Sequence, residues 1–126
     1  MSQYFDLGDE MLWNSSNGVS RMFQRQVALF EAELGIPSGV GPMENDECQV
    51  SSDSFETFVH ALLAQHRRAS HSVWLALHEG FAATVLVLAE RAGLATGIGM
   101  AAPTEGAAWA AGLCEKAREL DRVRPR

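Results

Sequence analysis

One long run of side chains at helical spacing constrains this chain more than any other feature. Between residues 53 and 91 a mostly apolar set recurs every three or four positions, and no proline interrupts it. The set consists of Phe55, Val59, Leu62, His66, Ser70, Val73, Leu77, Phe81, Thr84 and Leu88. Because an α-helix has 3.6 residues per turn, this spacing predicts a single helix over 53–91. Such a helix would be about 58 Å long, so another long helix must cover its apolar edge.

A second helical pattern precedes it, over about residues 16–34. Phe23 and Phe30 recur on one face of this segment, as expected for a helix that buries one side. Gly35 can adopt the left-handed conformation that closes a helix. Residues 35–52, which are rich in glycine and acidic side chains, are therefore predicted to form a loop.

A third helix is predicted over about residues 105–122, after a linker of small residues at 92–103. The helices over 16–34 and 53–91 are expected to pair as a long antiparallel hairpin. Because a two-helix hairpin leaves one apolar side uncovered, two such chains are expected to join as a four-helix bundle. The sequence thus predicts a single all-α domain over residues 1–126.

Charge and hydropathy limit the classes of partner and the locations that we expect for this chain. The formal net charge is −6, and a nucleic-acid binder usually presents a basic face, so nucleic acid is not an expected partner. The N-terminal segment has no basic region followed by an apolar run, so no cleavable signal peptide is predicted. Glu90 and Arg91 interrupt the most apolar window, so no transmembrane segment is predicted. The expected location is the cytoplasm, or outside the cell by a route that needs no cleavable signal.

All four histidines lie between residues 60 and 78, which raises the question of a metal site. On one straight helix His60, His71 and His78 share a face, but roughly 16 and 10 Å along the axis separate them. Zinc binds its ligands at about 2.0–2.1 Å, so no two of these histidines can hold one ion. No metal or other cofactor is therefore expected. The alternative is a site shared between chains that uses His60, Glu56, His71 and His78.

His66 differs from the other histidines because it lies on the apolar stripe. A buried polar group in a helical seam is usually hydrogen-bonded and can set the register of the helices. If His66 lies at an interface, protonation near its ordinary pKa of about 6.5 would weaken that interface. The residues expected at the interface between chains are Phe23, Phe30, Leu62, His66, Val73, Trp74, Leu77 and Phe81.

The sequence carries no recognisable catalytic motif. It contains no GxSxG, HExxH or EF-hand pattern, and nothing places its serines, histidines and aspartates together. Cys48 and Cys114 stand singly, without metal-binding spacing, and are interpreted as structural thiols. The sequence therefore predicts a non-enzymatic helical interaction protein that forms a homodimer or heterodimer. The alternative is a small helical bundle that binds a metal or an apolar ligand through its histidines.

The stretch FETFVHALLAQHRRASHSVWLALHEGFAATVLVLAERAG resembles the second helix of small type VII secretion substrates, the WxG or ESAT-six-like superfamily. A phenylalanine opens the helix, as in actinobacterial members, and the late EGFAAT step matches their pattern. The resemblance covers about residues 16–92 and implies a helical hairpin that pairs with a similar small helical protein. The resemblance implies either a type VII secretion substrate or its heterodimer partner. The chain lacks both the Trp-x-Gly turn and the C-terminal Tyr-x-x-x-Asp/Glu signal, which fits a partner that carries no export signal.

Overall fold

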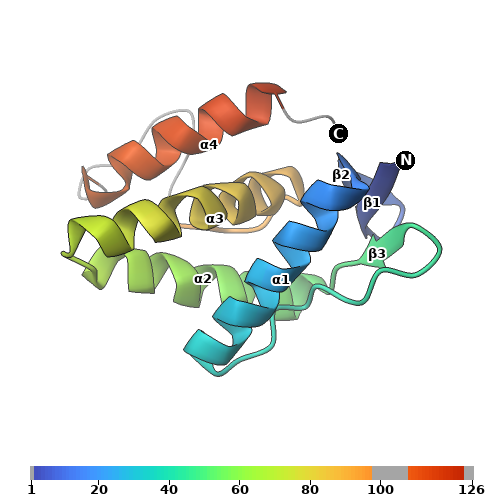
Figure 1. Ribbon diagram of the computed structural model, residues 1–126, viewed down its shortest axis with the longest axis horizontal. Coiled ribbons are helices and arrows are strands. Elements are labelled where there is room, and N and C mark those ends of the chain that lie inside the picture. The colour runs from blue at the N-terminus through green and yellow to red at the C-terminus, as the bar shows by residue number, and fades with distance from the viewer. Residues whose placement is uncertain (1, 98–107, 124–126) are drawn as a thin grey trace.

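The computed structural model describes residues 2–97 and 108–123, and within them the fold is α+β (Figure 1). The elements in chain order are β1 (Ser2–Leu7), β2 (Glu10–Ser16), α1 (Asn17–Leu34), β3 (Glu47–Gln49), α2 (Ser52–Arg68), α3 (Ser72–Arg91), the short 3-10 helix η1 (Ala108–Ala110) and α4 (Ala111–Val123). The prediction of an all-α fold is wrong, because the first 16 residues form two strands and the loop after α1 contributes a third.

The three strands form a small mixed sheet in the order β2-β1-β3 at one end of the molecule (Figure 1). β1 and β2 pair antiparallel, and Gly8 turns the chain between them with a positive φ of 60°. The register shifts between Phe5 and Asp6, and β2 buries the consecutive residues Leu12 and Trp13. Apolar and polar residues therefore do not alternate along these strands, and the usual sequence signal of a half-buried strand is missing.

α1 occupies the segment where the sequence predicts a helix over 16–34. The Ser16 hydroxyl accepts a hydrogen bond from the Val19 backbone N–H at 3.4 Å, which caps the first turn. Gly35 ends the helix with a left-handed φ of 71°. The helix then packs across α3 through its aromatic residues, with Phe23 5.7 Å and Phe30 4.6 Å from the ring of Phe81.

The helix predicted over 53–91 is two helices, so that prediction is wrong. Ala69 has an extended backbone with ψ of 141°, and the chain folds back so that α3 packs against α2. His71 starts α3, where its Nδ1 atom accepts a hydrogen bond from the Trp74 backbone N–H at 3.4 Å. Because α2 and α3 cover each other within one chain, neither a long hairpin nor a four-helix bundle of two chains is needed to bury the apolar stripe.

α3 is the central helix of the fold. Its second half is buried at every position from Phe81 to Ala89, between α1, α2, β2 and α4 (Figure 1). A helix that is apolar all round is typical of a protein core or of a membrane span. α3 is long and apolar enough to cross a membrane, with a mean hydropathy of 1.6, but 56% of that window is buried inside the protein. Its composition is thus that of a core helix here.

α4 lies along the other side of α3, where Arg91 fixes it (Figure 1). The Arg91 guanidinium lies 3.0 Å from Asp121 Oδ1 and donates a further hydrogen bond to the Leu12 carbonyl at 2.8 Å. The C-terminal helix was predicted over 105–122, and α4 with η1 covers 108–123. Residues 105–107 and the second half of the predicted linker, 98–103, lie outside the described part of the chain.

Candidate functional site

Exposed apolar surface gathers on two of the packed helices. Six large apolar side chains are exposed in the described part of the chain, and five of them belong to α1 or α3. We call these five the α1/α3 face: Val19, Met22, Leu29, Val73 and Leu77. Their exposed fractions run from 49% for Val19 to 77% for Leu77. Helical spacing places the first three along one side of α1 and the last two on one side of α3.

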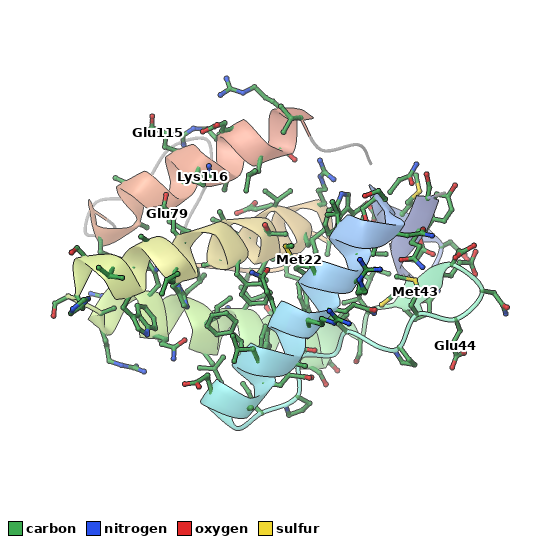
Figure 2. All side chains as sticks on the ribbon, in the orientation of Figure 1. Met22, Met43, Glu44, Glu79, Glu115 and Lys116 are labelled. Carbon is green, nitrogen blue, oxygen red and sulfur yellow. The ribbon has the colours of Figure 1, made fainter. Side chains whose placement is uncertain are left out.

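The two halves of this face adjoin each other. Phe30 of α1 packs flat on Phe81 and edge-on against His78, whose neighbour in the chain is Leu77. Farther along, a hollow of about 500 Å³ is lined by residues of both helices, among them Met22 and Thr84. Figure 2 shows Met22 on α1 near the point where this helix crosses α3. The face is therefore one surface that spans two helices.

A groove of about 760 Å³ opens at the α2–α3 turn, at one end of the face. Its apolar lining includes Val73, Trp74 and Leu77, and Arg68 and His71 add positive or titratable groups. No acidic residue lines it. This combination suits an apolar side chain that enters the groove from a partner, with a negative charge beside it.

A pair of buried histidines lies directly beneath this groove. The Trp74 ring, which lines the groove, stacks on His78 with ring centroids 4.4 Å apart. The Nδ1 atom of His78 lies 2.9 Å from Nδ1 of His66 on α2, within hydrogen-bond distance. The Nε2 atom of His78 is buried and has no hydrogen-bond partner among the described residues. The pair therefore joins α2 to α3 below the groove.

Burial sets the charge of this pair. It lowers the pKa of His78 from 6.5 to about 4, and repulsion from His66 contributes. Burial also lowers the pKa of His66, while the nearby carboxylate of Glu79 opposes that shift. Both imidazoles are thus neutral at pH 7. A hydrogen bond between two Nδ1 atoms requires at least one neutral ring, because only a neutral ring can accept.

The residues of the alternative metal site do not come together. His60 makes a 2.5 Å hydrogen bond through Nε2 with the Ala95 carbonyl, whereas His71 caps α3 and His78 pairs with His66. Glu56 lies near the start of α2. Nowhere in residues 2–97 and 108–123 do three or more histidine, cysteine, aspartate or glutamate side chains form a group able to hold a metal ion.

The predicted interface residues divide into two groups. Phe23, Leu62, His66 and Phe81 are buried inside the chain, with at most 8% exposed, and Phe30 is half-buried against the core. In this structure these five pack within the chain, where α1, α2 and α3 contact one another, and Phe30 alone of the five keeps some exposed surface. The three that remain accessible are Val73, Trp74 and Leu77.

The sequence interpretation missed the contribution of α1. Val19, Met22 and Leu29 are exposed, and none of the three was among the predicted interface residues. The available signal was the spacing of Met22 and Leu29, seven residues apart and beside the buried stripe. A helix with apolar residues on more than one side needs cover on more than one side.

The fold and this face define a small α+β protein whose exposed apolar surface is concentrated on two crossing helices. Over residues 1–126 the chain matches the model described as a family of unknown function (DUF6086), and it belongs to this family. No curated protein and no solved structure matches it significantly. The match provides no link to the type VII secretion superfamily, and the long helical hairpin behind that resemblance is not the fold of this chain.

Proposed function

We propose that this protein is a non-enzymatic interaction protein that binds a helical segment of a second protein on the α1/α3 face. The observation that supports this most is the placement of five of the six exposed large apolar side chains on that face. Soluble proteins commonly expose single apolar residues, whereas a contiguous apolar patch usually marks an interaction site.

The shape of the face favours a helix as the bound element. The face runs over two crossing helices, with a hollow where α1 meets α3 and an open groove at the α2–α3 turn. Amphipathic helices are commonly bound in this way, through apolar side chains three, four and seven residues apart. Trp74 at the groove is half-exposed, and a tryptophan in such a place is typical of the residues that dominate binding energy.

The experiment compares proteins retained by three tagged versions of the chain in its native cells. Leu77→Glu puts a charge in the middle of the face, and Val123→Glu makes the same change at an equally exposed site on α4. We expect one or more proteins to be retained by the wild type and by Val123→Glu but lost from Leu77→Glu. The same set of proteins on all three, with unchanged circular dichroism, would contradict the proposal.

A further inference from the structure

We infer that the bound segment is an amphipathic helix that carries acidic residues beside its apolar stripe. This inference rests on the proposed function and names the chemistry of the partner. It comes from the charges that surround the α1/α3 face, which differ in sign from the charge of the whole chain. The chain has 16 acidic and 10 basic residues, for a formal net charge of −6.

The rim of the face is basic. On α1, Arg21 and Arg25 line a hollow of about 350 Å³ together with Met22 and Leu29. At the other end, Arg68 lines the groove beside the α2–α3 turn. Neither these two depressions nor the hollow that joins α1 to α3 has an acidic residue in its lining.

These arginines form no ion pair with any of the described residues. Among the described residues Arg21, Arg25 and Arg68 have no carboxylate within 4.0 Å, whereas Arg91 does, in Asp121. All three are exposed. An exposed, unpaired guanidinium can form a bidentate pair with an incoming carboxylate, and burial of the surrounding apolar surface strengthens such a pair.

Most acidic residues of the chain lie away from the face. The exception is Glu33, which is exposed in the last turn of α1 on the same side as Val19, Met22 and Leu29. α1 carries acids only in its last turn, where Glu31 accepts a hydrogen bond from the Ser38 backbone N–H. Glu79 lies on the side of α3 toward α4, and Glu44 lies at the sheet end (Figure 2). The acids grouped around the sheet are Asp6, Asp9, Glu10, Glu44, Asp46 and Glu47. With three exposed arginines around it and one acid, the α1/α3 face is a net basic and apolar region of an acidic molecule.

The spacing of the charges matches a helix. Arg21 and Arg25 are one turn apart, about 6 Å along the axis of α1. Glutamates four residues apart on a helix that runs alongside would meet both of them. A second copy of this chain suits the face less well, because the face has three arginines around it and Glu33 as its one acid, so two-fold pairing of the face with itself would bring mostly like charges together.

The test uses a display library of 18-residue amphipathic helices with a fixed leucine and phenylalanine stripe. The positions beside the stripe are filled with glutamate, lysine or glutamine, and the library is selected on the wild-type chain. We expect selected helices to be enriched in glutamate and to lose binding to Leu77→Glu.

The double variant Arg21→Glu/Arg25→Glu should bind these helices about tenfold more weakly than the wild type does. The matched double variant Lys116→Glu/Arg122→Glu, with the same change in net charge on α4, should bind within about threefold of wild type.

Each other outcome overturns a defined part of the proposal. Helices that need Leu77 but show neither glutamate enrichment nor sensitivity to the Arg21 and Arg25 reversal overturn the acidic partner and leave the proposed function standing. No selected helix, or binding that Leu77→Glu does not change, overturns the proposed function as well. Sedimentation equilibrium of the purified chain completes the test: a dimer that Leu77→Glu dissociates would show that a second copy occupies the face and would overturn the acidic partner.

Discussion

The Nδ1 atoms of His66 and His78 lie 2.9 Å apart, one on α2 and the other on α3, across the fold-back that the chain makes at residues 69–71. One ring donates its N–H and the other accepts, so the contact ties the two helices together as long as a neutral imidazole accepts. His78 is 2% exposed, and its Nε2 atom has no hydrogen-bond partner in the described part of the chain. Protonation of His78 would place a positive charge in the core, with no hydrogen-bond acceptor at Nε2 to offset it.

Stability should therefore fall as the solution is acidified. The folded chain lowers the pKa of His78 from 6.5 to about 4, so the unfolded chain binds that proton more readily. The stabilisation is fully present above about pH 6.5 and is lost as the pH falls toward 4, by roughly 3 kcal/mol for this residue. Urea unfolding at pH 7.5, 6 and 5 measures the decline.

Two variants assign this decline to the pair. His78→Phe keeps an apolar ring in place but cannot titrate, so its free energy of unfolding should change less than that of the wild type between pH 6.5 and 4.5. His71→Asn removes an exposed histidine and keeps a residue that caps helices well, so it should follow the wild-type profile. A wild-type protein whose stability is constant from pH 7.5 to 4.5 would show that the pair does not titrate as described.

Arg91 should be the most important charged residue for stability. Its side chain is 8% exposed and joins α3 to α4 through Asp121 and to β2 through the Leu12 carbonyl. Arg91→Met should lower the free energy of unfolding by about 2–4 kcal/mol, because the buried carbonyl loses its donor. Asp121→Asn should cost about 1 kcal/mol, since that side chain is 41% exposed and keeps an acceptor oxygen. If urea unfolding shows that Arg91→Met and Asp121→Asn lower the free energy of unfolding by the same small amount, this prediction is contradicted.

Gly39 should not tolerate a side chain. Its φ is +80°, and a Cβ atom there would lie 2.7 Å from the Ser51 carbonyl oxygen and 2.8 Å from the Phe55 backbone nitrogen. Gly39→Ala should therefore lower the unfolding free energy by at least about 2 kcal/mol. Gly112→Ala, at a helical position with open space around it, should be neutral or stabilise by up to about 1 kcal/mol. Thermal unfolding that ranks the two variants in the opposite order would refute this local geometry.

The two thiols should resist alkylation in the folded protein. Both are free and fully buried, and burial raises the pKa of Cys48 to about 11 and also raises that of Cys114. Because the thiolate is the reactive form, iodoacetamide at pH 8 should label Cys48 at least about 100-fold more slowly than free cysteine. Both should react quickly in 8 M urea. Rapid labelling of Cys48 without denaturant, read by mass spectrometry, would mean that the loop after α1 opens readily.

Local signals in the sequence predicted the helices whose ends they mark. Ser16 and Gly35 bound α1, and the structure places it at Asn17–Leu34, within one residue of the expected range. α2 likewise begins at Ser52, next to the predicted start at residue 53. In these places capping chemistry and apolar spacing act over a few residues, so a single sequence is enough to read them.

The α2–α3 break was missed because the apolar spacing continues through it. The predicted stripe is buried as far as His66, exposed at Ser70, Val73 and Leu77, and buried again from Phe81 onward. His78 faces the core, while Leu77, which the stripe assigned to the core, is 77% exposed. No proline or glycine marks the turn, and the side-chain cap from His71 is an uncommon one. The exposed half of the candidate site on α3 therefore lies in the first turns after the break, before Phe81.

The α1/α3 face is tested most directly by the affinity of a selected glutamate-flanked helix for three proteins, measured by isothermal titration. Leu77 and Val123 are exposed to nearly the same extent, 77% and 75%, so replacing either with glutamate makes the same chemical change on and off the face. We expect the dissociation constant to rise by about 100-fold for Leu77→Glu and to stay within about threefold of the wild-type value for Val123→Glu. Equal affinities of the wild type and both variants would contradict the assignment of this face as a docking site.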